Sequence, residues 1–349
     1  MNPRRAGAVA RRIVLGFRHD RRSLALLFVA PIVVLTLVGA LWGSPATGTV
    51  RVIAAGDVDP QLYEALRGTN IQLQAMDTPA ALEEVRAGRA DAMIEFTGQG
   101  ATVTVEGSDP TRTGSFVSQM DAALTEIIIG SPLRAAVTVK YLYGGPGYTL
   151  LDYLAPVLIA VFAYFFIFLL SAVSFLRERT SGTLERLLAT PLTRAELVLG
   201  YLGGFALFAL LQALVILAFT VFVLKVQYRG NLATIFLVEA ILVVGAVSLG
   251  LAISAFARNE LQAVQFVPLV LVPQIFLSGL LVPVDQLNDV LRALSTIFPL
   301  TYANEALRAL MVKGYALTDP LILRDIGVLL LFAVLLAGAA VGSIRREVA

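Results

Sequence analysis

The chain has 349 residues, of which 57% are hydrophobic and only 15% are charged, and its formal net charge is +2. A soluble domain carries about 25% charged residues, so this composition excludes a soluble globular protein and predicts a polytopic membrane protein. The absence of cysteine and the single histidine, His19, exclude disulfides, thiolate metal sites and multi-histidine metal sites. We therefore expect no metal and no cofactor in this chain.

Residues 1–22, which we interpret as a cytoplasmic segment, combine arginines with an apolar stripe. Val9, Ile13, Val14 and Phe17 fall at helical spacing among the arginines. This pattern predicts an amphipathic helix that lies on the anionic inner leaflet. A disordered basic tail is one alternative. A cleaved signal peptide is another, but it calls for an apolar run of ~7–15 residues, which is shorter than the run at 23–42.

Six runs that are nearly free of charge each reach the ~20 residues needed to cross a bilayer core of ~30 Å. The runs are 23–42, 153–176, 197–224, 230–257, 261–284 and 326–344. Only the fourth contains a charged residue, Glu239. The sequence therefore predicts a polytopic α-helical membrane protein with six transmembrane helices, the first at 23–42 and the other five within 149–349.

Arginine placement predicts the orientation of these helices. Seven arginines precede the first run, four lie in the loop at 177–194, Arg258 follows the fourth run, and two more follow the sixth. By the positive-inside rule, both termini and these loops are cytoplasmic. Four basic residues after the fifth run depart from the rule, and they suggest a structured external region: Arg292, Arg308, Lys313 and Arg324.

Residues 43–148 have the composition of a soluble domain. Strands are predicted at 50–55, 71–75, 91–96 and 101–106, and helices at 60–67, 78–87 and 109–129. Thr78 is expected to cap the second of these helices, with Pro79 in its first turn. Alternating strands and helices predict a small α/β domain, which the topology makes extracytoplasmic.

The loop at 177–194 is longer and more highly charged than a simple connection requires. Within it, 178–192 is predicted to hold a short helix, because Gly182 allows a turn, Thr183 is placed to cap the helix and Pro191 ends it. We expect a partner on the aqueous side to bind this segment. A short helix that lies on the inner leaflet is the alternative.

Leucines and charged residues are expected on different sides of this short helix. Leu184, Leu187 and Leu188 fall at helical spacing and predict an apolar patch, from which Glu185 and Arg186 project. Such an element can fit a groove on a soluble partner. The residues expected to form the contact surface are Arg177, Glu178, Arg179, Gly182, Thr183, Leu184, Glu185, Arg186, Leu187 and Leu188.

The fifth run contains Pro268 and Pro273, which are expected to bend or break its helix. The segments after it, at 283–314, are too short or too polar to span a membrane. We interpret them as re-entrant or interfacial helices on the outer face.

Motifs of enzymatic chemistry are missing from the sequence. No glycine-rich loop ends in Gly-Lys-Ser or Gly-Lys-Thr, so no nucleotide-binding loop is predicted. There is also no Gly-x-Ser-x-Gly elbow and no histidine-based dyad. The chain is therefore not expected to be an enzyme.

Polar residues inside the apolar runs are the remaining candidates for function. Glu239 is the one acid, and a charge at membrane depth costs ~2.5–3.5 kcal/mol on insertion scales. It is either structural, paired with Gln212 or a backbone group, or part of a substrate cavity or a proton path. Gln212 and Gln274 are weaker candidates for that cavity, and Gln262 and Gln265 are expected to join helices or a dimer interface.

Three stretches together resemble the permeases of type-2 ABC exporters, in the daunorubicin-resistance and sodium-export permease group. The most specific is the loop at 177–194, Arg-Glu-Arg-Thr-Ser-Gly-Thr-Leu-Glu-Arg-Leu-Leu-Ala-Thr-Pro-Leu-Thr-Arg. Residues 276–283 with 298–303, and residues 18–22 with Pro31, are similar to the end and the start of that family. The external domain is similar as well, so the resemblance covers essentially the whole chain.

The resemblance implies a prokaryotic inner-membrane exporter subunit that pairs with a separate ATPase, usually as two permeases with two ATPases. That partner would bind ATP and Mg²⁺, and the loop at Glu178–Leu188 would be its coupling surface. The first and fifth spans would form the permease dimer interface, with Gln262, Gln265, Pro268 and Pro273 in the fifth. The cargo would be a lipid, a drug-like amphiphile or an ion, and no nucleic acid is implied.

Two other classes of protein fit parts of the sequence. An ion-coupled carrier could use Glu239, although such carriers often show inverted repeats and none is seen here. A membrane-anchored receptor could use the external domain, but it would not need a charged helical loop between its second and third spans.

Overall fold

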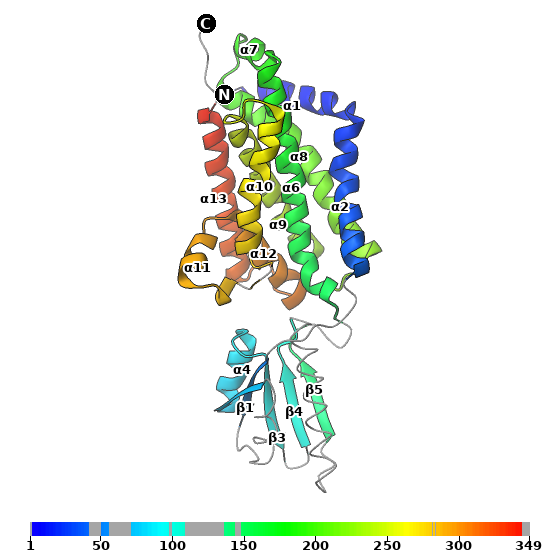
Figure 1. Cartoon of the computed structure of the whole chain (residues 1–349), viewed down its shortest axis with the longest axis vertical. Helices are drawn as coiled ribbons and strands as arrows, with labels where there is room; N and C mark the ends of the chain where they lie inside the picture. Colours follow the sequence, from blue (N-terminus) through cyan, green and yellow to red (C-terminus); the bar gives the residue numbers. More distant parts are fainter. Residues whose placement is uncertain are drawn as a thin grey trace. The chain divides into compact units, whose positions relative to one another are not determined.

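The computed structural model describes residues 2–41, 50–55, 71–97, 100–108, 136–143, 148–280, 282 and 284–343. These residues form two compact units, one of residues 1–39 with 154–349 and one of residues 40–153. In Figure 1 the first unit is a helical bundle, and the second contains a β-sheet.

Within the described residues, six helices are long and apolar enough to cross a membrane, which agrees with the predicted number of spans in a helical membrane protein. They are α2 (Arg21–Leu41), α6 (Leu150–Thr180), α8 (Arg194–Ala218), α9 (Leu232–Ser254), α10 (Glu260–Leu277) and α13 (Pro320–Ser343). A π-helical turn, η1 (Phe219–Val223), extends α8.

Side-chain caps set where these helices begin. Thr193 and Glu196 form a capping box at the start of α8. Asn231 and Asn259 accept backbone hydrogen bonds at the starts of α9 and α10. Each cap satisfies amide groups that the first turn leaves without a helical partner.

Helices α6 and α9 are the most buried of the spanning helices in the described part of the chain. Buried aromatic side chains of α6 contribute to the core of the bundle, among them Tyr164, Phe168 and Phe175. A Cβ placed on Gly250 of α9 would lie 2.8 Å from the carbonyl oxygen of Phe168, so only glycine allows α9 to approach α6 this closely.

Helix α10 runs unbroken from Glu260 to Leu277, although a break at its prolines was one of the predicted outcomes. Pro268 and Pro273 both lie on its exposed side. The chain leaves the helix only at Ser278 and Gly279, where Gly279 has a φ of 86°. The helix therefore accommodates both prolines without a change of secondary structure.

The segment predicted at 283–314 consists of short helical pieces. They are η2 (Val284–Gln286), α11 (Asp289–Ser295), α12 (Pro299–Arg308) and the π-helical turn η3 (Ala309–Lys313). The buried Asn304 of α12 donates hydrogen bonds to the carbonyl oxygen and to the hydroxyl of Ser278, at 3.0 and 2.8 Å. Arg308 also donates to the carbonyl oxygen of Gly279. These bonds hold α12 against the end of α10.

The second unit contains a five-stranded sheet in the order β2-β1-β3-β4-β5. Its strands are β1 (Val50–Ala55), β2 (Ile71–Met76), β3 (Ala92–Thr97), β4 (Gly100–Val105) and β5 (Ala136–Tyr141). Neighbouring strands are parallel except β3 and β4. The first four strands confirm their predictions.

Helix α4 (Thr78–Arg86) packs on this sheet through Ala81 and Val85, against Ile53 and Met93. The prediction that Thr78 caps α4 is wrong, because Asp77 occupies the N-cap and Thr78 is already helical. Pro79 fits the first turn, as expected. The helices predicted at 60–67 and 109–129 lie outside the described residues.

Candidate functional site

Helix α7 (Thr183–Leu188) is a single short helix between α6 and α8, and it stands at one end of the bundle (Figure 1). Only Ser181 and Gly182 separate it from α6, and Gly182 takes a left-handed φ of 68° that glycine adopts freely. The prediction of a turn at Gly182 is confirmed. Thr183 is not the cap, because Gly182 occupies that position and Thr183 begins the helix.

The side chains of α7 divide between the bundle and solvent. Leu184 is buried at 6% exposure, and Leu187 and Leu188 are half-buried. Glu185 and Arg186 are exposed, and within the described part of the chain neither makes an ion pair. Leu184 therefore anchors α7 to its own protein, and the two charges remain available to a partner.

The last turn of α6 ties α7 to three other helices. Arg177 binds Glu260 of α10 through two parallel hydrogen bonds of 2.8 and 3.0 Å. Glu178 accepts hydrogen bonds from Arg12 at 2.8 and 2.9 Å, and Arg179 donates to the carbonyl oxygen of Ser254 at 2.6 Å. These three predicted contact residues are thus engaged within the bundle rather than presented with Glu185.

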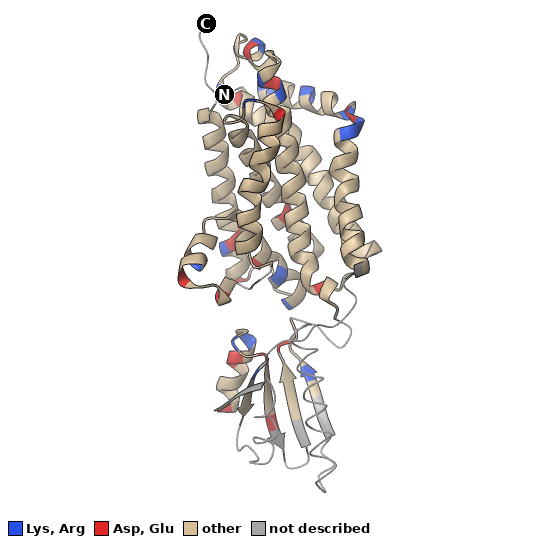
Figure 2. Ribbon diagram, in the orientation of Figure 1, with Lys and Arg blue, Asp and Glu red and all other residues tan. Residues whose placement is uncertain are grey.

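Figure 2 shows charged residues at both ends of the bundle, and we call the end that carries α7 the α7 end. Exposed ion pairs of this kind contribute only ~0–1 kcal/mol each. The two parallel hydrogen bonds between Arg177 and Glu260 nevertheless fix the end of α6 relative to the start of α10. A displacement of α7 would therefore act on α10 as well as on α6.

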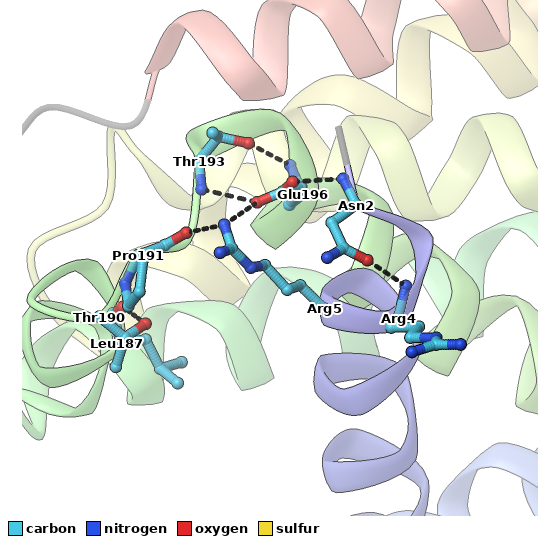
Figure 3. Close-up of polar contacts among 8 residues, drawn as sticks. All are labelled: Asn2, Arg4, Arg5, Leu187, Thr190, Pro191, Thr193 and Glu196. Carbon is cyan, nitrogen blue, oxygen red and sulfur yellow. Dashed lines mark hydrogen bonds and ion pairs between the residues drawn. The ribbon is translucent and has the colours of Figure 1, made fainter.

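The connection after α7 is held by the start of helix α1 (Pro3–Arg18) (Figure 3). The buried carboxylate of Glu196 accepts hydrogen bonds from the backbone amides of Thr193 and Asn2, at 3.0 and 2.6 Å. Arg5 lies 3.9 Å from the same carboxylate and donates to the carbonyl oxygen of Pro191. The start of α1 thus holds the α7–α8 connection at Pro191 and at the first turn of α8.

The apolar stripe of α1 packs on α8, not on lipid as predicted. Val9, Ile13 and Phe17 are buried. They meet Gly200 and Gly204, where an added Cβ would lie 2.5 Å from the Cβ of Val9 and 2.7 Å from that of Ile13. Two glycines on α8 therefore create the groove into which α1 fits, and the disordered-tail alternative is wrong.

An open cavity of about 680 Å³ lies between α1, the end of α6, α8 and the start of α10. Its walls include Phe17, Tyr201 and Phe205, and the ion pairs of Arg12 and Arg177 both lie on it. Sequence reasoning missed this site, because it assembles residues from four separate segments.

A family model described as "ABC-2 family transporter protein" matches residues 21–341. The chain belongs to the ABC-2 transporter family.

Relatives of this ABC-2 chain include ABC transporter G family member 20 of Dictyostelium discoideum, with 30% identity over 230 residues, 66% of this chain and 30% of the relative. The probable multidrug ABC transporter permease YbhS of Escherichia coli K12 is 34% identical over 139 residues, 40% of this chain and 37% of the relative. The linearmycin resistance permease protein LnrN of Bacillus subtilis 168 is 27% identical over 175 residues, 50% of this chain and 45% of the relative. The match spans less than half of each relative.

The predicted cavity residues of the ABC-2 chain all lie in the interior of the bundle. Glu239 and Gln212 are fully buried, and Gln274 is 2% exposed. Within the described residues, Glu239 and Gln212 have no hydrogen-bond partner, so the predicted pairing between them is absent. Gln274 donates to the carbonyl oxygen of Val270 at 3.2 Å. None of the three lines the cavity at the α7 end.

The predicted dimer-interface residues all belong to α10. Gln265, Pro268 and Pro273 are exposed on one side of the helix. Gln262 is half-buried, and its side chain accepts a hydrogen bond from the amide of Arg258 at 2.8 Å. Gln262 therefore orders the turn before α10, whereas the other three remain on a surface open to lipid or to a second copy.

Several residues that build this site were not singled out from the sequence. Arg5, Arg12, Glu196 and Glu260 hold α7 through α1, α8 and α10. One local signal was present, because Thr193 and Glu196 have the spacing of a capping box. The partners of Arg12 and Arg177 are far away in sequence and left no such signal.

Proposed function

We propose that this chain is the membrane-spanning permease subunit of an ATP-driven ABC exporter, and that a separate ATPase subunit binds at α7. The observation that carries the proposal is the exposed pair Glu185 and Arg186 on a short helix anchored by Leu184. Unpaired charges on a rigid projecting element suit a complementary soluble surface. The ion pairs of Arg177 and Glu178 would transmit movement of α7 to α10 and α1.

The proposal extends to topology, assembly and cargo. Both termini and α7 would be cytoplasmic, and the α/β unit extracytoplasmic, in the inner membrane of a prokaryote. Two permeases would meet through the exposed side of α10 and bind two ATPases, which hold ATP and Mg²⁺. Within the family, the chain would belong to the daunorubicin-resistance and sodium-export permeases. The transported substrate would be a lipid-like or drug-like amphiphile or an ion.

Transport by the reconstituted complex tests the energy source. Proteoliposomes that contain the permease and its ATPase should transport when ATP is supplied and ion gradients are collapsed. ATP with an inactive ATPase should give no transport. Transport that needs an ion gradient and ignores ATP would instead support the carrier alternative, and ligand binding without any transport would support the receptor.

Glu239 gives a second test within the same assay. Burial of an ionised carboxylate without a hydrogen-bond donor costs several kcal/mol. In the described residues neither carboxylate oxygen of Glu239 has a hydrogen-bond partner, so we expect Glu239 to bind a proton or a polar partner during transport. Glu239→Gln, which keeps the shape, is expected to preserve expression and reduce transport. Wild-type transport by Glu239→Leu would remove Glu239 from any cargo or proton role.

A further inference from the structure

Helix α1 carries arginines on two different sides. Arg5 and Arg12 are engaged within the bundle, where they hold the α7–α8 connection and the end of α6. Arg4, Arg11 and Arg18 are exposed, and in the described part of the chain the side chains of these three form no salt bridge and no hydrogen bond. Figure 3 shows the side chain of Arg4 directed away from the contacts that Arg5 makes. One helix therefore combines paired and unpaired guanidinium groups.

The unpaired arginines form a line along α1, which we call the arginine stripe (Arg4, Arg11 and Arg18). Each is seven residues from the next, and seven residues make nearly two turns of an α-helix. Arg11 is two residues from both Val9 and Ile13, which places it about 200° around the helix from each. Val9 and Ile13 pack on α8. The arginine stripe therefore lies on the side of α1 away from α8.

The position of α1 in the chain places this stripe near the surface of the membrane. Only His19 and Asp20 separate α1 from α2, which is one of the six candidate spans. Figure 1 shows α1 at the α7 end of the bundle, where it leads into α2. Ala8 and Leu15 lie between the arginines of the stripe, and Leu15 is 44% exposed. The side of α1 away from α8 thus alternates basic and apolar residues, as a helix at a lipid interface does.

The carboxylates near α1 are already engaged by other groups. Glu178 accepts two hydrogen bonds from Arg12. Asp20 accepts hydrogen bonds from the hydroxyl and the amide of Ser23, and it also interacts electrostatically with Arg177. Among the described residues, the protein therefore supplies no anionic partner to the arginine stripe.

We propose that the arginine stripe of α1 binds the phosphate groups of anionic phospholipids at the membrane surface. A guanidinium group can donate two parallel hydrogen bonds to a phosphate, and a long arginine side chain can place its charge at the headgroups while its stem contacts apolar groups. Successive arginines are about 10 Å apart along the helix, at ~1.5 Å per residue, so each can bind a different lipid. The proposal goes beyond the exporter function and does not depend on it.

A fluorescent label beside the stripe can report which lipids lie there. The chain contains no cysteine, so Ala8→Cys introduces a unique attachment site for the fluorophore bimane. Position 8 is exposed, four residues after Arg4 and three before Arg11, and is therefore next to both on the helix surface. Val334→Cys provides the control label, because Val334 is 68% exposed in the apolar helix α13.

The test is quenching of bimane in the full chain, reconstituted without an ATPase in phosphatidylcholine vesicles. Spin-labelled phosphatidylglycerol, which is anionic, is compared with spin-labelled phosphatidylcholine, which carries a phosphate but no net charge. Each arginine near an anionic surface favours binding about fivefold, so position 8 should prefer phosphatidylglycerol about fivefold or more. Position 334 should show a preference of less than about twofold. Salt at about 1 M, where charges are screened within ~3 Å, should remove the preference at position 8.

Two triple variants in the Ala8→Cys chain separate charge from structure. Replacement of Arg4, Arg11 and Arg18 by glutamine should reduce the preference to about one, and replacement of all three by lysine should keep most of it. Because these side chains are unpaired within the described residues, neither variant should change the temperature of thermal unfolding by more than a few degrees.

Equal quenching by the two lipids at position 8 of the unsubstituted stripe would overturn the proposal, as would a preference that survives 1 M salt. A preference that persists in the glutamine variant would assign it to other basic residues and would also overturn the proposal. If addition of the ATPase abolished quenching at position 8 by both lipids, the stripe would be a protein interface instead. Loss of ATP-driven transport with an intact lipid preference would count against the proposed exporter function alone.

Discussion

Glu185→Lys in α7 is expected to abolish ATP-coupled transport while the permease stays folded in the membrane. Glu185 is exposed and makes no ion pair among the described residues, so reversal of its charge should change the stability of the bundle little. At an interface with an ATPase, loss of a charge partner costs about 2–5 kcal/mol. Copurification of the ATPase and coupled ATP hydrolysis are the measurements.

The control for this variant is Asp285→Lys. Asp285 is also exposed, in η2, which precedes α11 at the end of the bundle opposite α7 (Figure 1). The substitution should leave the complex and its coupling unchanged. If α7 lay instead on the anionic inner leaflet, the added lysine of Glu185→Lys would be neutral or favourable, and a fully coupled complex would result.

Gly200→Ala in α8 is expected to displace α1 and destabilise the protein by about 1–3 kcal/mol, as overpacking does. Its Cβ would lie 2.5 Å from the Cβ of Val9 and 2.9 Å from the carbonyl oxygen of Ala6. Release of α1 would break its contacts with Glu178 and Glu196. Thermal unfolding should occur at a lower temperature, and trypsin should cleave faster after Arg11 and Arg12.

Gly203→Ala is the matched control, about one turn along the same helix. Its Cβ would lie 3.6 Å from that of Ala10, an ordinary contact. Alanine also stabilises a helix by ~1 kcal/mol relative to glycine, so this variant should be as stable as the original protein or slightly more stable. Equal behaviour of the two variants would contradict the close packing of α1 on α8.

The spans and four strands could be predicted because their signals are local. A run of apolar residues long enough to cross a bilayer is rarely compatible with any structure but a transmembrane helix. Strand β5 was not predicted, although its sequence Ala-Val-Thr-Val-Lys-Tyr alternates and contains β-branched residues. This signal is as local as those of the other strands, so β5 was equally predictable in principle.

The arrangement of the candidate site could not be predicted, because it depends on contacts between distant segments. Arg177 and Glu260 are 83 residues apart, and Arg12 and Glu178 are 166 apart. The sequence pattern of an amphipathic helix is also the same whether its apolar side contacts lipid or protein. Only Gly200 and Gly204 distinguish the two cases, and their meaning depends on knowing that α1 crosses α8.

The most direct measurement is photo-crosslinking from α7 in a complex that hydrolyses ATP. Benzoylphenylalanine in place of Ala189, the exposed residue that caps the end of α7, should form a covalent adduct with the ATPase. The same group in place of Val290, which is 77% exposed in α11, should form none. An active complex that gives no adduct from position 189, or an equal yield from position 290, would contradict the assignment of α7 as the surface that binds the ATPase.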